Sequence, residues 1–143
     1  MATIHLDIVT VERPVVSEDV DYISAPGIDG VIGILPRHEP LLTALTFGEL
    51  RYRKGGQESA FAIGGGFMEV RPDKVTVLAD SADQAEEIDE ARAEEARKRA
   101  QELLAQKPEN DVEAARLEQA IRRAELQLRV ARKERRRLEQ RSD

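Results

Sequence analysis

The sequence predicts an antiparallel β-sandwich or barrel in its first part, followed by an antiparallel two-helix hairpin. All nine glycines lie between Gly27 and Gly66, and five of the six prolines fall within the first 72 residues. Near Ile88 the spacing of apolar residues changes from two, as in strands, to about 3.6, as in helices. We therefore expect two segregated domains of α+β type, residues 1–87 and residues 88–143.

Alternation and turn residues define the strands of the first domain. Ile4, Leu6 and Ile8 alternate with other residues, so one face of this strand is buried and the other is wet. Gly55-Gly56 can supply the positive φ angles of a two-residue hairpin turn, and Pro72-Asp73 presets a second turn. Further strands are predicted at residues 20–25, 31–35, 41–45, 49–53, 59–63, 67–71 and 75–79.

The second domain has the pattern of two helices. Lys107-Pro108-Glu109-Asn110 ends the first helix, and Asp111 suits the N-cap of the second. Because the seam of the first helix is mostly alanine, little apolar area is buried and we expect a hairpin of modest stability. The predicted seam residues are Ile88, Ala91, Ala96, Ala100, Leu103 and Leu104, then Leu117, Ile121, Ala124, Leu128, Ala131 and Leu138, with Arg135 interrupting the second set.

Residue types exclude several classes of site. The chain has no cysteine, which excludes a disulfide scaffold and thiol chemistry and agrees with a reducing, cytoplasmic compartment. His5 and His38 are too few and too distant for a recognisable metal set, and no Ser-His-Asp order suggests nucleophilic catalysis. Residues 64–66 are all glycine, but no Gly-Lys-Ser/Thr follows, so we interpret them as a strand-linking turn. We predict no catalytic residue and no metal site.

The net charge of −6 is unevenly distributed. Residues 1–87 carry 7 basic and 15 acidic side chains, a net of −8, whereas residues 88–143 carry 15 basic and 13 acidic, a net of +2. Within residues 122–141, nine basic residues face three acidic ones, a net of +6. The acidic total argues against general nucleic-acid binding, and no apolar run approaches the ~18–20 residues of a membrane span. We therefore expect no nucleic-acid partner and no direct membrane insertion.

Three charged residues share one face of the first predicted helix. Asp89, Arg92 and Arg99 are spaced by three and seven residues. One interpretation is an intrahelical ion pair with an acid that compensates the helix dipole. The other is a polyanion site, in which two guanidinium groups hold phosphate oxygens and the second helix adds Arg122 or Arg123.

Four blocks of sequence carry a family resemblance. They are Gly33-Ile34-Leu35-Pro36-Arg37-His38, Gly65-Gly66-Phe67-Met68-Glu69-Val70, Lys74-Val75-Thr76-Val77-Leu78-Ala79 and Ile88-Asp89-Glu90-Ala91-Arg92-Ala93. Together, and in this order, they resemble the epsilon subunit of bacterial F-type ATP synthase over essentially the whole chain.

The resemblance implies a β-sandwich of about ten strands, with two sheets packed face to face, ahead of the hairpin. It implies a place on the central rotor stalk, with the gamma subunit, the c-ring and the alpha and beta subunits as partners. Such a subunit couples proton-driven rotation to ATP synthesis on the beta subunits and is not itself an enzyme. It is expected to lie peripherally at the cytoplasmic face of the bacterial cell membrane.

The resemblance also implies a regulatory hairpin. When the helices extend along gamma, the basic second helix meets an acidic loop of a beta subunit and blocks ATP hydrolysis. A ligand that prefers the folded hairpin relieves this block, and in some members that ligand is ATP. We therefore expect no required cofactor, and ATP, with or without Mg²⁺, as a regulatory ligand. The implied inhibitory residues are Arg122, Arg129, Arg132, Lys133, Arg136 and Arg137.

The implied ATP site follows the family motif with two departures. Asp83 stands where a glutamate is found, and Gln127 falls where ATP-binding members have a second arginine. Loss of one guanidinium costs roughly 1.5–3 kcal/mol if it contacts phosphate directly, so we expect weaker binding than in the best binders. The implied site residues are Ile88, Asp89, Arg92, Ala93, Arg99, Arg123 and Asp83.

A second hypothesis comes from a different functional class. The same architecture suits a stand-alone adaptor or chaperone, in which the sandwich presents a coiled-coil hairpin to clients. The rotor subunit should co-purify with a membrane-extractable multi-subunit ATPase, and the adaptor should not.

Overall fold

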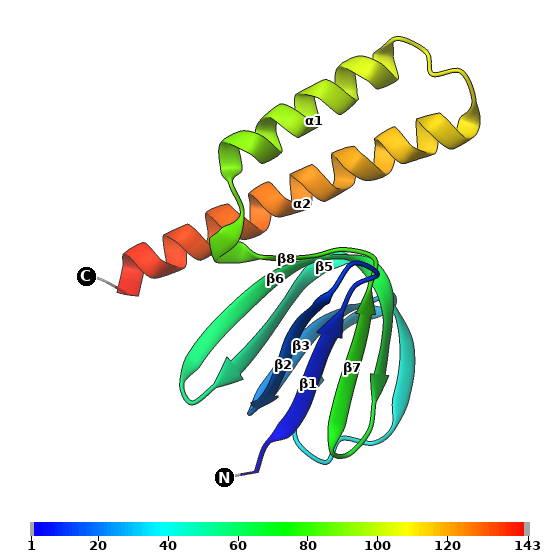
Figure 1. Ribbon diagram of the computed structural model, residues 1–143. Coiled ribbons are helices and arrows are strands. Elements are labelled where there is room, and N and C mark those ends of the chain that lie inside the picture. The colour runs from blue at the N-terminus through cyan, green and yellow to red at the C-terminus, as the bar shows by residue number, and fades with distance from the viewer. Residues whose placement is uncertain (1, 142–143) are drawn as a thin grey trace. The chain divides into compact units, whose positions relative to one another are not determined.

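Eight strands, one short 3-10 helix and two α-helices make up the computed structural model, which describes residues 2–141 (Figure 1). The chain divides into two units, the first ending at Gln84 and the second beginning at Ala85. The outermost positions of the predicted domains, residues 1 and 142–143, lie outside the described residues. The strands are β1 (Ile4–Val9), β2 (Pro14–Val20), β3 (Tyr22–Gly27), β4 (Gly30–Ile34), β5 (Leu41–Lys54), β6 (Gln57–Val70), β7 (Lys74–Ala79) and β8 (Ala82–Gln84). They are followed by η1 (Ala85–Glu87), α1 (Glu90–Ala105) and α2 (Asp111–Arg141).

One folded sheet contains the strands of the first unit. Their order is β2-β1-β7-β6-β5-β3-β4, and β8 pairs with β6 outside this path. The neighbours are antiparallel except β1 and β7, which run parallel. β5 and β6 pair along nearly their whole length, and β6 has β8 as its other neighbour at residues 61–63 and β7 at residues 66–70. The predicted β-sandwich followed by a helical hairpin is confirmed.

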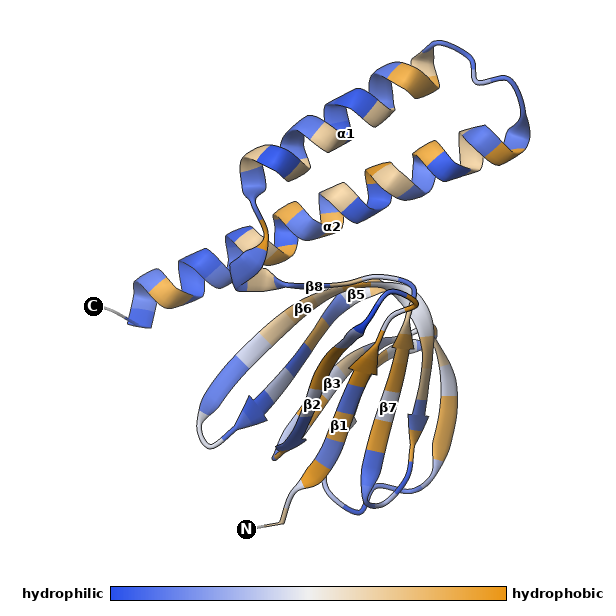
Figure 2. Ribbon diagram, in the orientation of Figure 1, coloured by the Kyte–Doolittle hydropathy of each residue, from blue (hydrophilic) through white to orange (hydrophobic). Residues whose placement is uncertain are grey.

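Strict alternation builds the core of the sandwich. In β1, Ile4, Leu6 and Ile8 are buried, whereas the residues between them are partly exposed, as their period of two predicts. Figure 2 shows the same contrast of apolar and polar residues along the strands. The core cluster consists of Ile4, Leu6, Ile8, Val16, Val20, Ile23, Ala25, Ile34, Leu45, Leu50, Tyr52, Phe61, Ile63, Met68, Val70, Val75, Val77, Ala79 and Ala82.

The strand count differs from the expected ten because predicted runs merge. The runs at 41–45 and 49–53 form the single strand β5, and those at 59–63 and 67–71 form β6. Two strands were not predicted, β2 and β8. β2 lies at an edge of the sheet, where Pro14 is tolerated and polar residues face outward.

Glycines provide one confirmed turn and one corrected one. Gly55 and Gly56, with φ of 57° and 84°, connect β5 to β6 as predicted. The turn predicted at residues 64–66 is wrong, because these glycines lie inside β6. Their unusual backbone is real, since Gly65 and Gly66 have φ of 97° and 128°, and Gly65 has no partner in the β5–β6 ladder, whose register is otherwise unchanged. The glycines therefore bend a continuous strand instead of ending it.

Side-chain caps start both helices of the second unit. Asp89 is the N-cap of α1, and its carboxylate accepts a 3.1 Å hydrogen bond from the Arg92 backbone N–H. At the start of α2 the cap is Asn110 and not the predicted Asp111, because the Asn110 side chain accepts a 2.8 Å bond from the Glu113 N–H.

α1 and α2 pair as an antiparallel hairpin through small residues (Figure 1). On α2 the predicted seam is found in part, with Ala124, Leu128 and Ala131 buried, whereas the predicted Leu138 is exposed. On α1 the seam runs through Ala93 and Ala100, whereas Ala91, Ala96 and Leu103, which were placed in it, are exposed. The alanine-rich contact keeps the apolar area between the helices small.

Candidate functional site

The sandwich exposes apolar side chains on three neighbouring strands. Leu42 of β5, Phe67 of β6 and Leu78 of β7 are 71%, 59% and 56% exposed. Phe67 is directly opposite Leu78 in the β6–β7 ladder, and Leu42 lies on the same side of the sheet. We call these three residues the apolar face. Since such side chains favour burial, this face is the candidate surface of the sandwich for contact with another protein.

Further large apolar side chains are exposed at the ends of β3 and β4. Ile28 lies in the turn between them, and its backbone N–H donates a 3.0 Å bond to the Ala44 carbonyl of β5. Val31 is exposed and is the second residue of β4, an edge strand of the sheet. Leu35 follows β4 and is exposed as well.

Outward-facing polar residues on β1 and β2 form a hydrogen-bonded cluster. His5 Nδ1 lies 2.8 Å from Asp19, and its Nε2 lies 3.1 Å from both Asp7 and Ser17. The hydrogen bond to Asp19, with Asp7 beside it, raises the pKa of His5 above its ordinary value. The Ser17 hydroxyl, followed by Lys74 at 3.1 Å and by His5, holds the pKa of Asp7 below its usual range.

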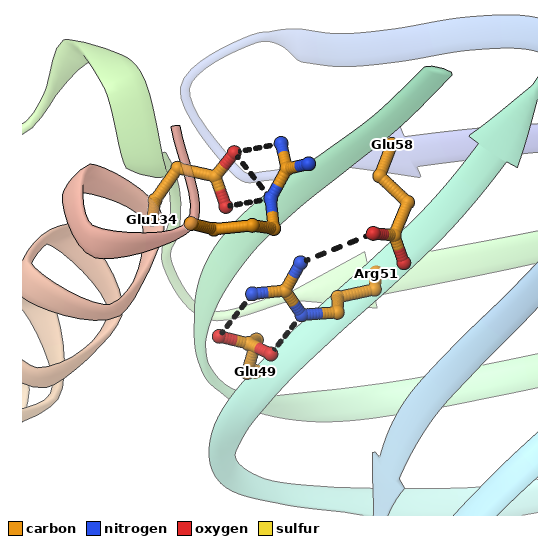
Figure 3. A network of polar contacts seen from close by, with 5 residues as sticks. Glu49, Arg51, Glu58 and Glu134 are labelled. Atoms are coloured by element: carbon orange, nitrogen blue, oxygen red, sulfur yellow. Dashed lines mark hydrogen bonds and ion pairs between the residues drawn. The ribbon is translucent and has the colours of Figure 1, made fainter. Parts of the chain in front are cut away.

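A second polar group lies on β5 and β6. Arg51 of β5 forms ion pairs with Glu49 of the same strand and, at 3.8 Å, with Glu58 of β6 (Figure 3). Tyr52, which follows Arg51, points to the core side, and its hydroxyl donates a 2.9 Å bond to Glu18. Burial raises the pKa of this phenol. These contacts orient side chains at the sheet surface.

Ion pairs close one end of the helical hairpin. Arg135 of α2 donates a 2.7 Å hydrogen bond to Glu90 of α1, and Arg132 donates a 3.3 Å bond to the same carboxylate. Arg132 also lies 3.6 Å from Glu94. Arg135, the residue that interrupts the seam in the sequence, therefore links the helices by charge. We call these four residues the hairpin latch.

The residues of the implied ATP site occupy different positions. Asp89 caps α1, and Ala93 is buried between the helices. Arg92 and Arg99 are exposed on α1. The half-buried Ile88 lines a pocket of about 580 Å³ with Ala85, Glu86, Glu90, Ala131, Arg135 and Leu138. Arg123 lies exposed on α2, and Asp83 lies in β8 of the first unit. The intrahelical ion pair considered for Asp89 is replaced by a cap to the backbone.

The six implied inhibitory residues also differ in their contacts. Arg132 belongs to the hairpin latch, and Arg137 forms an ion pair with Glu134 one turn earlier. Arg129 and Arg136 are exposed and have no ion pair among residues 2–141. Arg122 and Lys133 are exposed as well. The hairpin therefore holds some of these cations internally and leaves Arg129 and Arg136 available.

The described residues form neither a cluster of metal-ligating side chains nor a membrane-spanning helix. Within residues 2–141, no three His, Asp or Glu side chains are gathered as a metal site would require. No helix in the same stretch is long and apolar enough to pass through a bilayer.

The chain is a two-domain protein of segregated α+β type. A β-sandwich with an exposed apolar face comes first, and a helical hairpin with a basic second helix follows. The chain belongs to the ATP synthase delta/epsilon chain family. The family's beta-sandwich domain matches residues 3–85, and its long alpha-helix domain matches residues 86–132. This membership confirms the resemblance drawn from the sequence.

Close relatives and a solved structure agree with this assignment. The ATP synthase epsilon chain of Dehalococcoides mccartyi is 55% identical over 135 residues, which cover 94% of this chain and 96% of that one. The epsilon chain of Herpetosiphon aurantiacus is also 55% identical, over 90% of this chain and 93% of that one. A chain of the Euglena gracilis mitochondrial ATP synthase, from a structure of OSCP, F1 and the c-ring, matches with a TM-score of 0.72 and 25% identity. That match covers 88% of this chain and 79% of the Euglena chain.

The sequence did not point to the apolar face. Phe67 and Met68 are adjacent, and in a strand only one of them can face the core. Met68 is fully buried, so Phe67 must face outward. The same alternation places Leu78 on the outer face, beside the buried Val77. Two adjacent apolar residues in a strand are therefore the sequence signal for this surface.

Proposed function

We propose that this chain is a central-stalk subunit of a proton-translocating F-type ATP synthase. It couples rotation of the c-ring to ATP synthesis on the catalytic subunits and does not catalyse the reaction itself. The family membership and the 55% identical epsilon chains support this proposal. The stand-alone adaptor is not favoured, because these relatives are named as ATP synthase chains.

The observation that carries the proposal is the apolar face of the sandwich. A stalk subunit must hold its rotor partners while torque is transmitted, and burial of Leu42, Phe67 and Leu78 supplies an attachment that salt does not screen. We assign this face to contact with the gamma subunit or the c-ring. Through that attachment the chain lies peripherally at the cytoplasmic face of the bacterial cell membrane.

The basic second helix gives the subunit a brake on ATP hydrolysis. Residues 122–141 carry a net charge of +6 and suit an acidic surface of a beta subunit, where charge steers docking. In the folded hairpin, Glu90 and Glu94 already form ion pairs with Arg132. The folded and docked states therefore compete for the same cation, and a ligand that stabilises the hairpin releases the brake.

The test removes four basic side chains of α2 that belong to the implied inhibitory set. Replacing Arg129, Lys133, Arg136 and Arg137 by Ala should raise ATP hydrolysis of the reconstituted complex several-fold, because the docked state loses four charges. Rotor assembly should be retained, since the apolar face is unchanged. A matched control neutralises Arg13, Lys98, Lys107 and Arg116, which are also exposed and lie outside residues 122–141. Latency that survives the first change, or is lost equally in the control, would contradict docking by these residues.

We further propose ATP as the regulatory ligand, bound through Arg92, Arg99 and Arg123. The exposure of Arg92 and Arg99 supports this assignment, because the cap at Asp89 uses the backbone of Arg92 and leaves its guanidinium group unoccupied. Titration calorimetry of the isolated chain with MgATP should give saturable heat that Arg92→Ala weakens. No heat at millimolar MgATP would refute ATP binding and leave the stalk role intact.

A further inference from the structure

A second concavity of the hairpin is lined mainly by arginine. A pocket of about 330 Å³ lies between α1 and α2, and its wall includes Leu128 and one carboxylate, Glu125. The remaining lining residues are Arg97, Arg129, Arg132 and Arg136. Arg97 comes from α1 and the other three from α2, so both helices contribute cations to one small space.

The arginines of this pocket are only partly neutralised. Glu94 forms ion pairs with Arg97 and, at 3.6 Å, with Arg132. Glu90 pairs with Arg132 as well. Arg129 and Arg136 have no such partner within residues 2–141. The Nε of Arg97 is buried without a hydrogen-bond partner among the same residues, so one donor of the pocket remains unsatisfied.

The pocket lies on a different side of the hairpin from the implied ATP site. On α2, residues 125, 129, 132 and 136 follow one another by four, three and four, so they share one flank of the helix. On α1, Arg97 is five residues beyond Arg92, which places it about 140° around the helix axis. Arg99 lies near Arg92 on that other side, because seven residues complete about two turns.

We propose that this pocket binds a compact multivalent oxyanion, a phosphate or diphosphate group. Guanidinium groups offer paired N–H donors that match such oxygens, and four of them around a small space suit a compact anion. The Glu125 carboxylate opposes the anion, so binding depends on Arg129 and Arg136, which form no ion pair with any of residues 2–141. Because Arg97 belongs to the other helix, the bound anion ties α1 to α2 and stabilises the folded hairpin.

The test titrates the full chain with inorganic diphosphate at constant ionic strength, followed by amide NMR shifts. We expect saturable shifts at the residues of the pocket. The double variant Arg129→Gln with Arg136→Gln should weaken binding by at least roughly tenfold, because it removes the two unpaired guanidinium groups. The control Lys98→Gln with Lys107→Gln removes the same charge outside the pocket and outside the implied ATP site, and should leave binding unchanged. Arg92→Gln with Arg99→Gln is measured separately, to test whether diphosphate occupies the implied ATP site instead. Far-UV circular dichroism confirms that all three variants retain their helices.

The outcomes separate this site from the ATP site of the proposed function. If diphosphate does not bind, or if the Lys98 and Lys107 control weakens it as much as the Arg129 and Arg136 variant does, the pocket is not an oxyanion site. If only the Arg92 and Arg99 variant loses diphosphate, the anion belongs to the implied ATP site and the inference is overturned. Competition between ATP and diphosphate for shifts at Arg129 and Arg136 would support the pocket and identify a nucleotide as a source of the phosphate. MgATP binding that depends on Arg92 alone leaves the ATP proposal standing whatever the pocket does.

Discussion

A single hydrogen atom at Gly66 permits the approach of β6 to β7. A Cβ at this position would lie 2.1 Å from the Leu78 carbonyl oxygen, and φ is +128°, a conformation that residues with side chains rarely adopt. Gly66→Ala should therefore destabilise the sandwich by at least about 2–3 kcal/mol, through strain and the displaced strand. Chemical unfolding followed by circular dichroism measures the loss.

Gly55 serves as the control for this substitution. It also has a positive φ, +57°, but its Cβ would have no atom within 4 Å. Gly55→Ala should therefore cost only about 1 kcal/mol, the price of the left-handed conformation alone. Equal losses for the two variants would show that the close approach at Gly66 is unimportant.

His5 makes part of the stability of the sandwich dependent on pH. Its pKa is raised by Asp19 and Asp7, so its folded value lies above its ordinary unfolded value of about 6.5. The stabilisation is complete below the unfolded pKa and is lost as pH rises through the folded pKa. The difference in stability between the native chain and His5→Gln should therefore shrink between about pH 6 and pH 8.

Thermal melts of both chains across that pH range measure this difference. The effect should be small, because His5 is more than one-third exposed and solvent screens its ion pairs. Asp7 has its effect at low pH. Because its pKa is lowered in the folded chain, its carboxylate stabilises the fold above about pH 4, and this stabilisation is lost as pH falls. A difference between native chain and His5→Gln that grows with rising pH would contradict the assigned direction.

At the scale of elements, the hairpin latch compensates for an alanine-rich seam. Glu90 and Arg135 are 28% and 56% exposed, so their pair should contribute only about 0.3–1 kcal/mol. A double-mutant cycle with Glu90→Gln and Arg135→Gln, read from amide exchange in α1, should show this coupling. The coupling should decline as salt rises from about 0.01 M to 1 M, because the Debye length shortens from about 30 Å to 3 Å. Additive effects of the two substitutions would mean that the latch does not hold the helices.

The sequence was most informative where its pattern was periodic. Both helices, the Gly55-Gly56 turn and the alternation of β1 were predictable, because helix spacing, turn chemistry and burial of one strand face act locally. β2 was missed because only Val16 and Val20 of this edge strand are fully buried, and the partly buried Val15 beside them breaks the alternation. β8 was missed because three residues are too few for a periodic signal.

The sites were less predictable than the elements. Which arginine faces which carboxylate depends on the register between α1 and α2, and helix periodicity alone does not fix that register. Arg97 was not singled out for this reason, although it lines the pocket with Arg129. The N-cap of α2 was also assigned to the wrong residue, Asp111 instead of Asn110. Asp and Asn are about equally good caps, so the sequence does not decide between two such neighbours.

At the scale of the molecule, the sandwich should fold without the helices. Its core cluster is drawn entirely from residues 4–82. A chain ending at residue 87 should therefore melt in one cooperative transition. Both tyrosines lie in the sandwich, and Tyr52 stacks on Phe61 at 6.1 Å, so near-ultraviolet circular dichroism reports this packing. Absence of that signal from the shortened chain would show that the core needs the hairpin.

The three residues of β8 have a mechanical consequence. They are the last residues of the sheet before the chain enters η1, and they pair only with residues 61–63 of β6. A pull on the helices would load the final pair, Phe61 with Gln84, first and then its neighbours one at a time, as a zipper opens. Tension from the hairpin would thus be relieved by separating the short strand β8 from β6. The long pairing between β5 and β6 would be loaded only afterwards.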